Sequence, residues 1–173
     1  LQYSNKGDLK EEIKNECLRG SNKFRLDSFQ ITTGQGPDSA QLTASFTLPD
    51  YARKLGTDWY LNLNLFKFYE HEEIDFPKRK IPIEYPFKYR KRYVTLLKIP
   101  DGYKVDYLPK GKSYHNEVWG FNLQYEQKGS MLILTQEFDN DYLLMGPDHF
   151  ELWNKVLENL FPLYKETLSL TKT

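Results

Sequence analysis

Apolar residues at every second position are the feature that most constrains the fold of this chain. Between Trp59 and Leu65 every second residue is apolar, and asparagines stand between the leucines. The same period recurs at residues 42–48, 119–125 and 132–138. Successive side chains of a strand point to opposite faces, so this period predicts half-buried strands. Because these segments come in runs without alternating helical patterns, the order argues against a parallel α/β fold.

Two segments have a helical period instead. Residues 8–19 begin with the Asp-x-x-Glu spacing of a capping box and carry an apolar stripe along one face. A second helix is predicted to start near Pro147 and to end near Leu160, because Pro162 cannot continue it. Its buried face is predicted from apolar residues three or four positions apart: Phe150, Trp153, Val156, Leu157 and Leu160.

Turn residues divide the strands. Pro100-Asp101-Gly102 predicts a hairpin turn between strands at residues 91–99 and 103–107. Lys128-Gly129 predicts a second reversal of the chain, between the strands at 119–125 and 132–138. Near Ser28 the apolar pattern changes face, which indicates a β-bulge. Further short strands are predicted at residues 82–87, 142–145 and 168–170.

These elements, about ten strands and two helices, predict a mainly β fold. We expect an antiparallel β-sandwich with a short N-terminal helix, and with a C-terminal helix near residues 147–161 followed by a last strand. The expected division is a linker with a short helix over residues 1–22, belonging to a preceding domain, and a sandwich domain over residues 23–173.

Composition limits the classes of partner. The 24 basic and 24 acidic residues balance, which removes any global attraction to nucleic acid. No apolar run approaches the roughly 20 residues that span a bilayer. Thirteen tyrosines, eleven phenylalanines and three tryptophans favour a β-rich core. The alternative is a face that stacks on sugar or peptide, for which the candidates are Tyr60, Tyr69, Tyr89 and Tyr114.

Cysteine catalysis would require a thiolate beside a histidine base. The single cysteine, Cys17, lies on the apolar stripe of the predicted first helix, where a buried thiol is inert. His71, His115 and His149 are scattered, and none has a histidine or cysteine at metal-ligand spacing. The sequence therefore predicts no catalytic residue, no metal site and no cofactor in this chain.

Charged and glycine-containing stretches have ordinary structural interpretations. Asp139-Asn140-Asp141 is predicted to be a polar turn rather than a calcium loop, which would need a Gly and a distal Glu. The acidic run at residues 70–75 is interpreted as a solvated loop, with paired glycosidase carboxylates as the alternative. The basic stretches at residues 78–80 and 88–92 are interpreted as solvated sheet edges. Gly34-Gln-Gly36 is too short to bind phosphate.

The order of these signals is similar to one known family. The chain resembles the C-terminal β-rich domain of unknown function that follows the catalytic core in bacterial transglutaminase-like proteins. The resemblance runs from about residue 8 to the end. It rests on ordered strand and turn motifs: Leu48-Pro-Asp-Tyr51 with Gly56, Trp59 to Phe66, Lys78 to Glu84, Leu97 to Val105 with Leu108-Pro109, a hairpin around Tyr125 and Gly129, and the helix and strand from residue 147.

The resemblance implies an accessory role in a larger exported protein, located in the periplasm, secreted or in the cell envelope. In such proteins a β-rich domain and a papain-like core with a Cys–His–Asp triad come first, so the triad would lie upstream of Leu1. A start at Leu1 without Met agrees with this expectation. The expected partner is the catalytic core of the same polypeptide. A freestanding carbohydrate- or peptide-binding module, and an enzyme such as a glycosidase, remain the alternatives.

Overall fold

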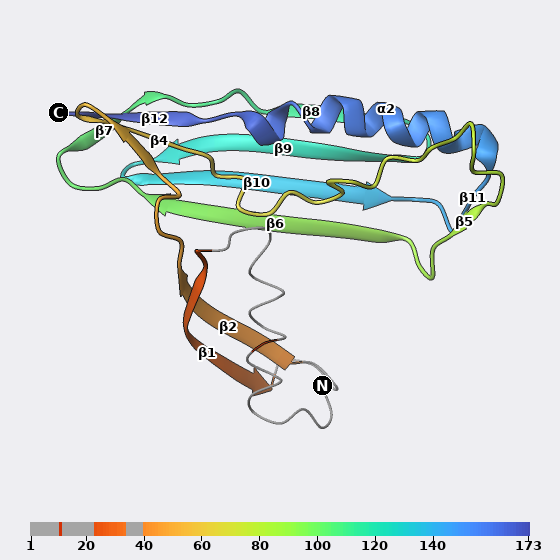
Figure 1. Ribbon diagram of the computed structural model, residues 1–173, viewed down its shortest axis with the longest axis horizontal. Coiled ribbons are helices and arrows are strands. Elements are labelled where there is room, and N and C mark those ends of the chain that lie inside the picture. The colour runs from red at the N-terminus through yellow and green to blue at the C-terminus, as the bar shows by residue number, and fades with distance from the viewer. Residues whose placement is uncertain (1–10, 12–22, 34–39) are drawn as a thin grey trace. The chain divides into compact units, whose positions relative to one another are not determined.

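The computed structural model describes residue 11 and residues 23–33 and 40–173, and the chain divides into two compact units, residues 1–52 and 53–173 (Figure 1). The helix predicted at residues 8–19 lies outside the described residues, apart from Glu11. Cys17 and the stretch Gly34–Gly36 also lie outside them.

In the first unit, β1 (Arg25–Thr33) and β2 (Ala40–Thr47) form an antiparallel ribbon. The pairing shifts register between Leu26 and Ser28, which confirms the bulge that the change of apolar face predicts. The ring of Phe24, which is buried, packs 5.1 Å from the ring of Phe46.

The second unit contains two four-stranded antiparallel sheets. The longer sheet has the order β6 (Tyr89–Lys98), β10 (Met131–Asn140), β9 (Trp119–Lys128), β8 (Lys112–His115). The shorter sheet has the order β3 (Arg53–Leu55), β4 (Asp58–Leu61), β12 (Leu168–Lys172), β7 (Tyr103–Tyr107). A further pair consists of β5 (Ile83–Glu84) and β11 (Leu144–Met145).

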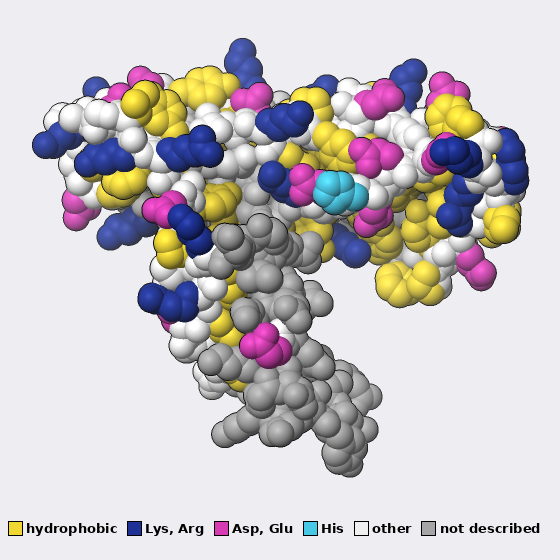
Figure 2. Space-filling model, in the orientation of Figure 1, with side chains coloured by type: hydrophobic (Ala, Val, Ile, Leu, Met, Phe, Trp, Pro, Cys, Tyr) yellow, Lys and Arg dark blue, Asp and Glu magenta, His cyan; other side chains and the backbone are white. Residues whose placement is uncertain are grey.

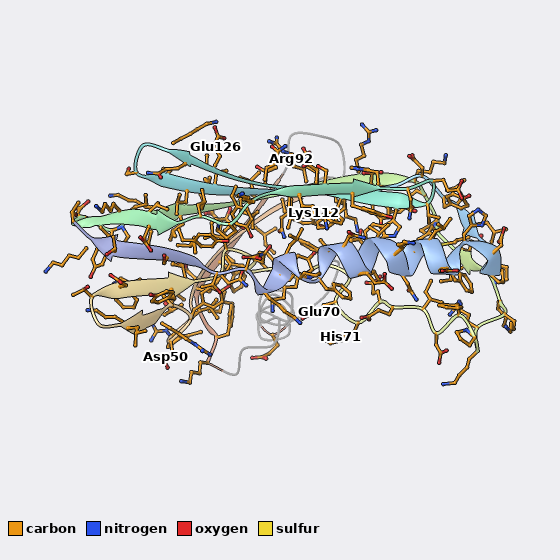
Figure 3. All side chains as sticks on the ribbon, turned by 90° about the horizontal axis from the view of Figure 1, so that it is seen from above. Asp50, Glu70, His71, Arg92, Lys112 and Glu126 are labelled. Carbon is orange, nitrogen blue, oxygen red and sulfur yellow. The ribbon has the colours of Figure 1, made fainter. Side chains whose placement is uncertain are left out.

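The long sheet forms one layer of this unit. The short sheet and helix α2 (Phe150–Leu160) lie end to end in the other layer, as Figure 3 shows from above. This arrangement confirms the mainly β, antiparallel sandwich with a C-terminal helix followed by a last strand. Among the described residues, no helix has the length and apolar character needed to cross a membrane.

Helix α2 confirms the helix predicted to start near Pro147 and to end near Leu160. All five residues of its predicted apolar face are buried. Pro147 begins a short 3-10 turn, Pro147–His149, that leads into the helix. The α-helix ends at Leu160, two residues before Pro162, and a second 3-10 turn follows at Leu163–Lys165.

The core lies between the two layers. Strand β10 alternates regularly, and Leu132, Leu134 and Phe138 point inward with at most 1% of their surface exposed. Such burial contributes roughly 1.5–3 kcal/mol for each large apolar side chain.

The strand predicted from Trp59 to Leu65 is wrong in its second half, because β4 ends at Leu61. The side chain of Asn62 accepts a hydrogen bond from the backbone N–H of Asn64 at 2.7 Å, which turns the chain out of the sheet. Asn64 is then buried and donates to Tyr125 Oη at 3.0 Å. The asparagines between the leucines therefore end the strand instead of lining its solvent face.

The hairpin predicted at Pro100–Gly102 is also wrong. The turn itself forms, with Tyr103 N–H donating to Pro100 O at 3.1 Å and Gly102 at φ +79°. However, β6 pairs with β10, and β7 pairs with β12, so the turn carries the chain from one sheet to the other. Ten-residue pairing with β10 outweighs the local preference for a hairpin partner.

Two other strand predictions have different outcomes. The turn at Lys128-Gly129 does join β9 to β10 as a hairpin, with Gly129 at φ +57°. The strand predicted at residues 82–87 contracts to Ile83–Glu84. Pro86 has no N–H to continue a ladder.

Side chains of the C-terminal helices hold the loop that follows β4. Asn154 forms two hydrogen bonds with the backbone of Ile74, one to its N–H and one to its C=O, both at 2.8 Å. Trp153 Nε1 donates to Glu72 O at 2.9 Å. Tyr164 Oη donates to Phe68 O at 3.0 Å. Backbone N–H and C=O groups of the loop thereby form hydrogen bonds with side chains, whereas in a sheet they would bond the backbone of a neighbouring strand.

We expect Asn154→Ala to lower the free energy of unfolding by about 2 kcal/mol, because it leaves both polar backbone groups of Ile74 without their partner. Denaturant unfolding of the full chain measures this loss. The matched control is Asn159→Ala on the same helix, whose hydrogen bonds lie at the surface and whose loss should cost less than about 0.5 kcal/mol. Equal losses for the two variants would contradict the assigned role of Asn154.

Candidate functional site

The long sheet has one face that no other element of the 53–173 unit covers. Its inner face packs against the short sheet, helix α2 and the loop after β4. Figure 3 shows Arg92 and Glu126 on the opposite side of the sheet from Glu70 and His71. We call this uncovered surface the outer face. It consists of the outward-pointing residues of β6, β10, β9 and β8.

A row of polar side chains crosses all four strands of the outer face. Arg92 Nε lies 3.3 Å from Glu137 Oε1. Asn122 Nδ2 donates to Glu137 Oε2 at 3.1 Å, and Ser113 Oγ donates to Asn122 Oδ1 at 2.7 Å. The four residues are brought together by strand register, since Arg92 lies opposite Glu137, which lies opposite Asn122 and then Ser113.

The neighbouring row depends on a glycine. His115 Nε2 lies 3.0 Å from Asp139 Oδ1, and the imidazole crosses the sheet above Gly120 to reach it. A Cβ on Gly120 would come within 2.0 Å of His115 Cδ2. Gly120 therefore leaves the space that the histidine ring occupies. Arg90 lies opposite Asp139 in the same row.

These two rows line a hollow of about 360 Å³. A second hollow of about 510 Å³ lies beside it and shares Ser113 and Asn122. Further along β6 the outer face becomes apolar, where Val94 is 49% exposed and Leu96 is 61% exposed. The outer face therefore joins a polar, hollowed half to an apolar strip, the combination found in interfaces between domains.

The polar half does not have the geometry of an activated nucleophile. A histidine–carboxylate pair activates a hydroxyl when that hydroxyl donates to the imidazole. The hydroxyl of Ser113 donates instead to Asn122. Among the described residues, no three histidine, cysteine or acidic side chains come close enough to hold a metal ion. The rows can form hydrogen bonds and ion pairs with a partner surface.

The four candidate tyrosines do not share one surface. Tyr69 and Tyr89 come together, with hydroxyls 2.8 Å apart. The ring of Tyr69 packs on Trp119, Phe138 and Trp153. Tyr60 lies on β4 in the short sheet, 36% exposed, and Tyr114 packs against the core from β8.

The other candidates of the sequence fall in separate places. Glu70 and His71 lie in the loop after β4, on the side away from the outer face (Figure 3). The hydroxyl of Tyr142 lies 2.9 Å from His149 Nε2. Residues 89–92 lie on β6, which is an edge strand as predicted.

The polar turn predicted at Asp139–Asp141 is wrong for its first two residues. Asp139 and Asn140 are the last residues of β10, where they continue the alternation of the strand. Asp139 faces outward to His115, whereas Asn140 is buried and bonds the backbone of Tyr142. Asp139 therefore joins the outer face.

Sequence reasoning did not identify Ser113, Asn122 and Glu137, which belong to different strands. Their outward positions follow from the alternation of β9 and β10, but their alignment requires the register. Gly120 could have been singled out from the sequence, because a glycine inside a strand often marks a site where another group closely approaches the backbone.

Burial raises the pKa of a group of tyrosines in the described part of the chain: Tyr69, Tyr85, Tyr89, Tyr125 and Tyr164. For Tyr85 the pKa rises to about 12, and for Tyr69 the hydrogen bond with Tyr89 adds to the effect of burial. These side chains remain neutral in the folded protein at a pH where exposed tyrosines ionise, near pH 10.

Alkaline pH should therefore destabilise the fold. The folded-state pKa values exceed the unfolded ones, so the stabilisation is complete below about pH 10 and is lost as the pH rises towards 12. Denaturant unfolding at pH 9, 10 and 11 measures the loss, and absorbance at 295 nm follows ionisation. Tyr69→Phe should make stability fall less steeply over this range; an unchanged slope would contradict the assignment.

One comparison with known proteins identifies a family. The model of the family described as a domain of unknown function with a solved structure, DUF3858, matches residues 57–170. No curated protein and no solved structure matched the chain. The matched residues include the long sheet, helix α2 and strands β4, β7 and most of β12. The chain therefore belongs to the DUF3858 family, a family of domains of unknown function.

Proposed function

We propose that this chain is a non-catalytic accessory domain of a larger, exported transglutaminase-like protein, and that its outer face docks on the catalytic core of the same polypeptide. The observation that carries the proposal is the outer face, which the rest of the 53–173 unit leaves uncovered and which has an apolar strip beside two ordered polar rows. The resemblance of the motif order to domains that follow such cores supports the identity of the partner.

The chemistry of the outer face favours a partner that belongs to the same chain. Interfaces between domains of one polypeptide are more polar than those of obligate oligomers. Arg92, Glu137 and Asn122 already hold one another in fixed positions, so a partner does not have to order them on docking. Val94 and Leu96 supply the apolar area.

A non-catalytic role agrees with the orientation of Ser113, whose hydroxyl donates away from His115. In this proposal the chemistry belongs to the upstream Cys–His–Asp core. The domain would position that core or its substrate in the periplasm, in the cell envelope or outside the cell.

The coding sequence before Leu1 tests the identity of the parent protein. We expect an export signal followed by a region with the cysteine, histidine and aspartate of a papain-like core. A start codon directly before Leu1, or an upstream region without these residues, would refute the accessory role.

Binding between this chain and that core, produced as separate polypeptides, tests the docking face. We expect Leu96→Asp and Arg92→Glu each to weaken the affinity at least about tenfold, because they place a charge in the apolar strip or reverse one in the polar row. The matched control is Leu55→Asp on strand β3, which is also exposed but lies in the other sheet. Affinities unchanged by the first two variants would exclude the outer face as the interface.

A further inference from the structure

Strand β6 forms an open edge of the long sheet. Its one strand partner in the described part of the chain is β10. The strand at the opposite edge, β8, also contacts helix α2, since Lys112 Nζ donates to Asn159 Oδ1 at 2.8 Å. Figure 1 shows β6 along the border of the sheet that lies away from α2. An open edge has backbone N–H and C=O groups that a further strand can bind.

The register identifies the backbone groups of β6 that point outward. Ile99 N–H donates to Ser130 O at 2.8 Å, one position beyond the last pair of β6 and β10. In an antiparallel ladder both backbone groups of one residue point to one neighbouring strand, and those of the next residue point the other way. The odd-numbered residues of β6 therefore bond β10. The outward groups belong to the even-numbered residues: Arg90, Arg92, Val94, Leu96 and Lys98.

The length and regularity of β6 distinguish it from the other edges of the two four-stranded sheets. β6 pairs with β10 over ten residues without a register shift, and it contains no proline. By contrast, β3 has three residues, β8 has four, and the pairing of β7 with β12 has a register shift. Proteins commonly protect an edge by shortness, by a bulge or by proline. Since β6 has none of these features, a strand of similar length can pair along it.

The side chains of β6 determine which sequence fits beside it. The strand contains four basic residues and no acidic one, and its outer face is basic at both ends and apolar in the middle. Figure 2 shows Lys and Arg side chains on the lower border of this unit, which β6 forms in Figure 1. Opposite charges directly across two strands stabilise their pairing, and like charges destabilise it. The edge therefore selects a segment that is acidic at its ends and apolar in its middle.

The acidic residues of the long sheet do not cancel this preference. Glu137 and Asp139 lie on β10, one strand further from the edge, and Asp139 is held by His115 at 3.0 Å. Four basic residues on β6 and two acidic residues on β10 leave the two strands with a charge of +2. The direct neighbours of an added strand are the side chains of β6, which include no acidic group.

The same charges disfavour a second copy of this chain as the partner. Two copies of β6 paired about a two-fold axis at Val94 would place Arg90 of one copy opposite Lys98 of the other. An axis at Thr95 would place Arg92 opposite Lys98. Both arrangements bring like charges together, so the partner is a segment of different sequence.

We infer that the edge of β6 binds an extended, acidic peptide segment by strand addition. The outward backbone groups of Val94 and Leu96 bond the backbone of the segment, and the basic residues at the two ends of β6 pair with its carboxylates. The inference does not depend on the proposed docking of the outer face, because it rests on backbone groups at the border of the sheet.

Fluorescence anisotropy of a labelled peptide mixed with the full chain tests this inference. The peptide Glu-Thr-Val-Thr-Val-Thr-Glu-Thr-Glu, bound antiparallel, places its valines opposite Leu96 and Val94 and its first glutamate opposite Lys98. We expect saturable binding with a Kd below about 100 μM. The same peptide with lysines in place of the glutamates should bind at least about tenfold more weakly.

N-methylated peptides separate strand addition from attraction between charges alone. Methyl groups on the two valine amides remove donors that face β6, and they should weaken binding at least about tenfold. The matched control has methyl groups on the two threonines that flank the second valine. Their amides point away from β6, so this peptide should bind as the unmodified one does.

Variants of the chain assign the binding to β6. Val94→Pro removes an outward N–H without removing a bond to β10, and it should weaken binding at least about tenfold. Val94→Ala keeps the N–H and should weaken binding about threefold at most. Lys98→Glu should weaken binding about fivefold, and a peptide whose first glutamate is replaced by lysine should restore it. Circular dichroism establishes that each variant is folded.

The inference is overturned if the glutamate peptide shows no saturable binding, or if methylation of its valine amides leaves the affinity unchanged. Binding of the lysine peptide as tight as that of the glutamate peptide would also overturn it. The methylated peptides decide the question even if Val94→Pro does not fold. Because these measurements contain no upstream core, their outcome is independent of whether the outer face docks on that core.

Discussion

The contact between Trp119 and Trp153 joins three segments of the 53–173 unit: the long sheet, helix α2 and the loop after β4. The two indoles stack with ring centroids 4.6 Å apart, which fastens strand β9 to helix α2. Trp119 Nε1 donates to the backbone carbonyl of Trp153 at 3.3 Å, and Trp153 Nε1 donates to that of Glu72. One aromatic pair thereby connects sheet, helix and loop, and both of its buried donors find acceptors.

The same attachment decides which side of the long sheet the rest of the 53–173 unit leaves uncovered. Helix α2, the short sheet and the loop after β4 all pack on the inner side, so the outer residues are left to satisfy one another. They do so across strands, through Arg92, Glu137 and Asn122. A sheet face whose polar side chains bond one another can stay exposed to water without another element packed on it. It also presents a partner with side chains whose positions are already fixed.

Local patterns predicted most of the elements, but of the two predicted strand pairings only the one across Lys128-Gly129 is correct. The apolar face of α2 follows from a helical period within eleven residues, and the structure buries all five positions. The Pro100–Gly102 turn also forms, yet its flanking strands join different sheets, because pairing depends on partners far away in sequence. For the same reason, the alternation of apolar residues indicates that Asn122 and Glu137 face solvent, but it does not predict their hydrogen bond. That bond follows only from the register between β9 and β10. The prediction that this strand continues to Leu65 is wrong because the side chains of Asn62 and Asn64 end it, although the spacing of the leucines alone would continue it.

The position of β12 has a consequence for the order in which the protein can be made. This strand is the last in the chain, yet it lies between β4 and β7 in the short sheet. It follows β7 by about sixty residues, which a ribosome adds over several seconds. During that interval the long sheet can already have formed, since its four strands are complete at Asn140. Its inner, apolar side then has neither α2 nor the short sheet upon it. Until residues 168–172 are added, the layer that covers this apolar side therefore lacks the strand that joins β4 to β7.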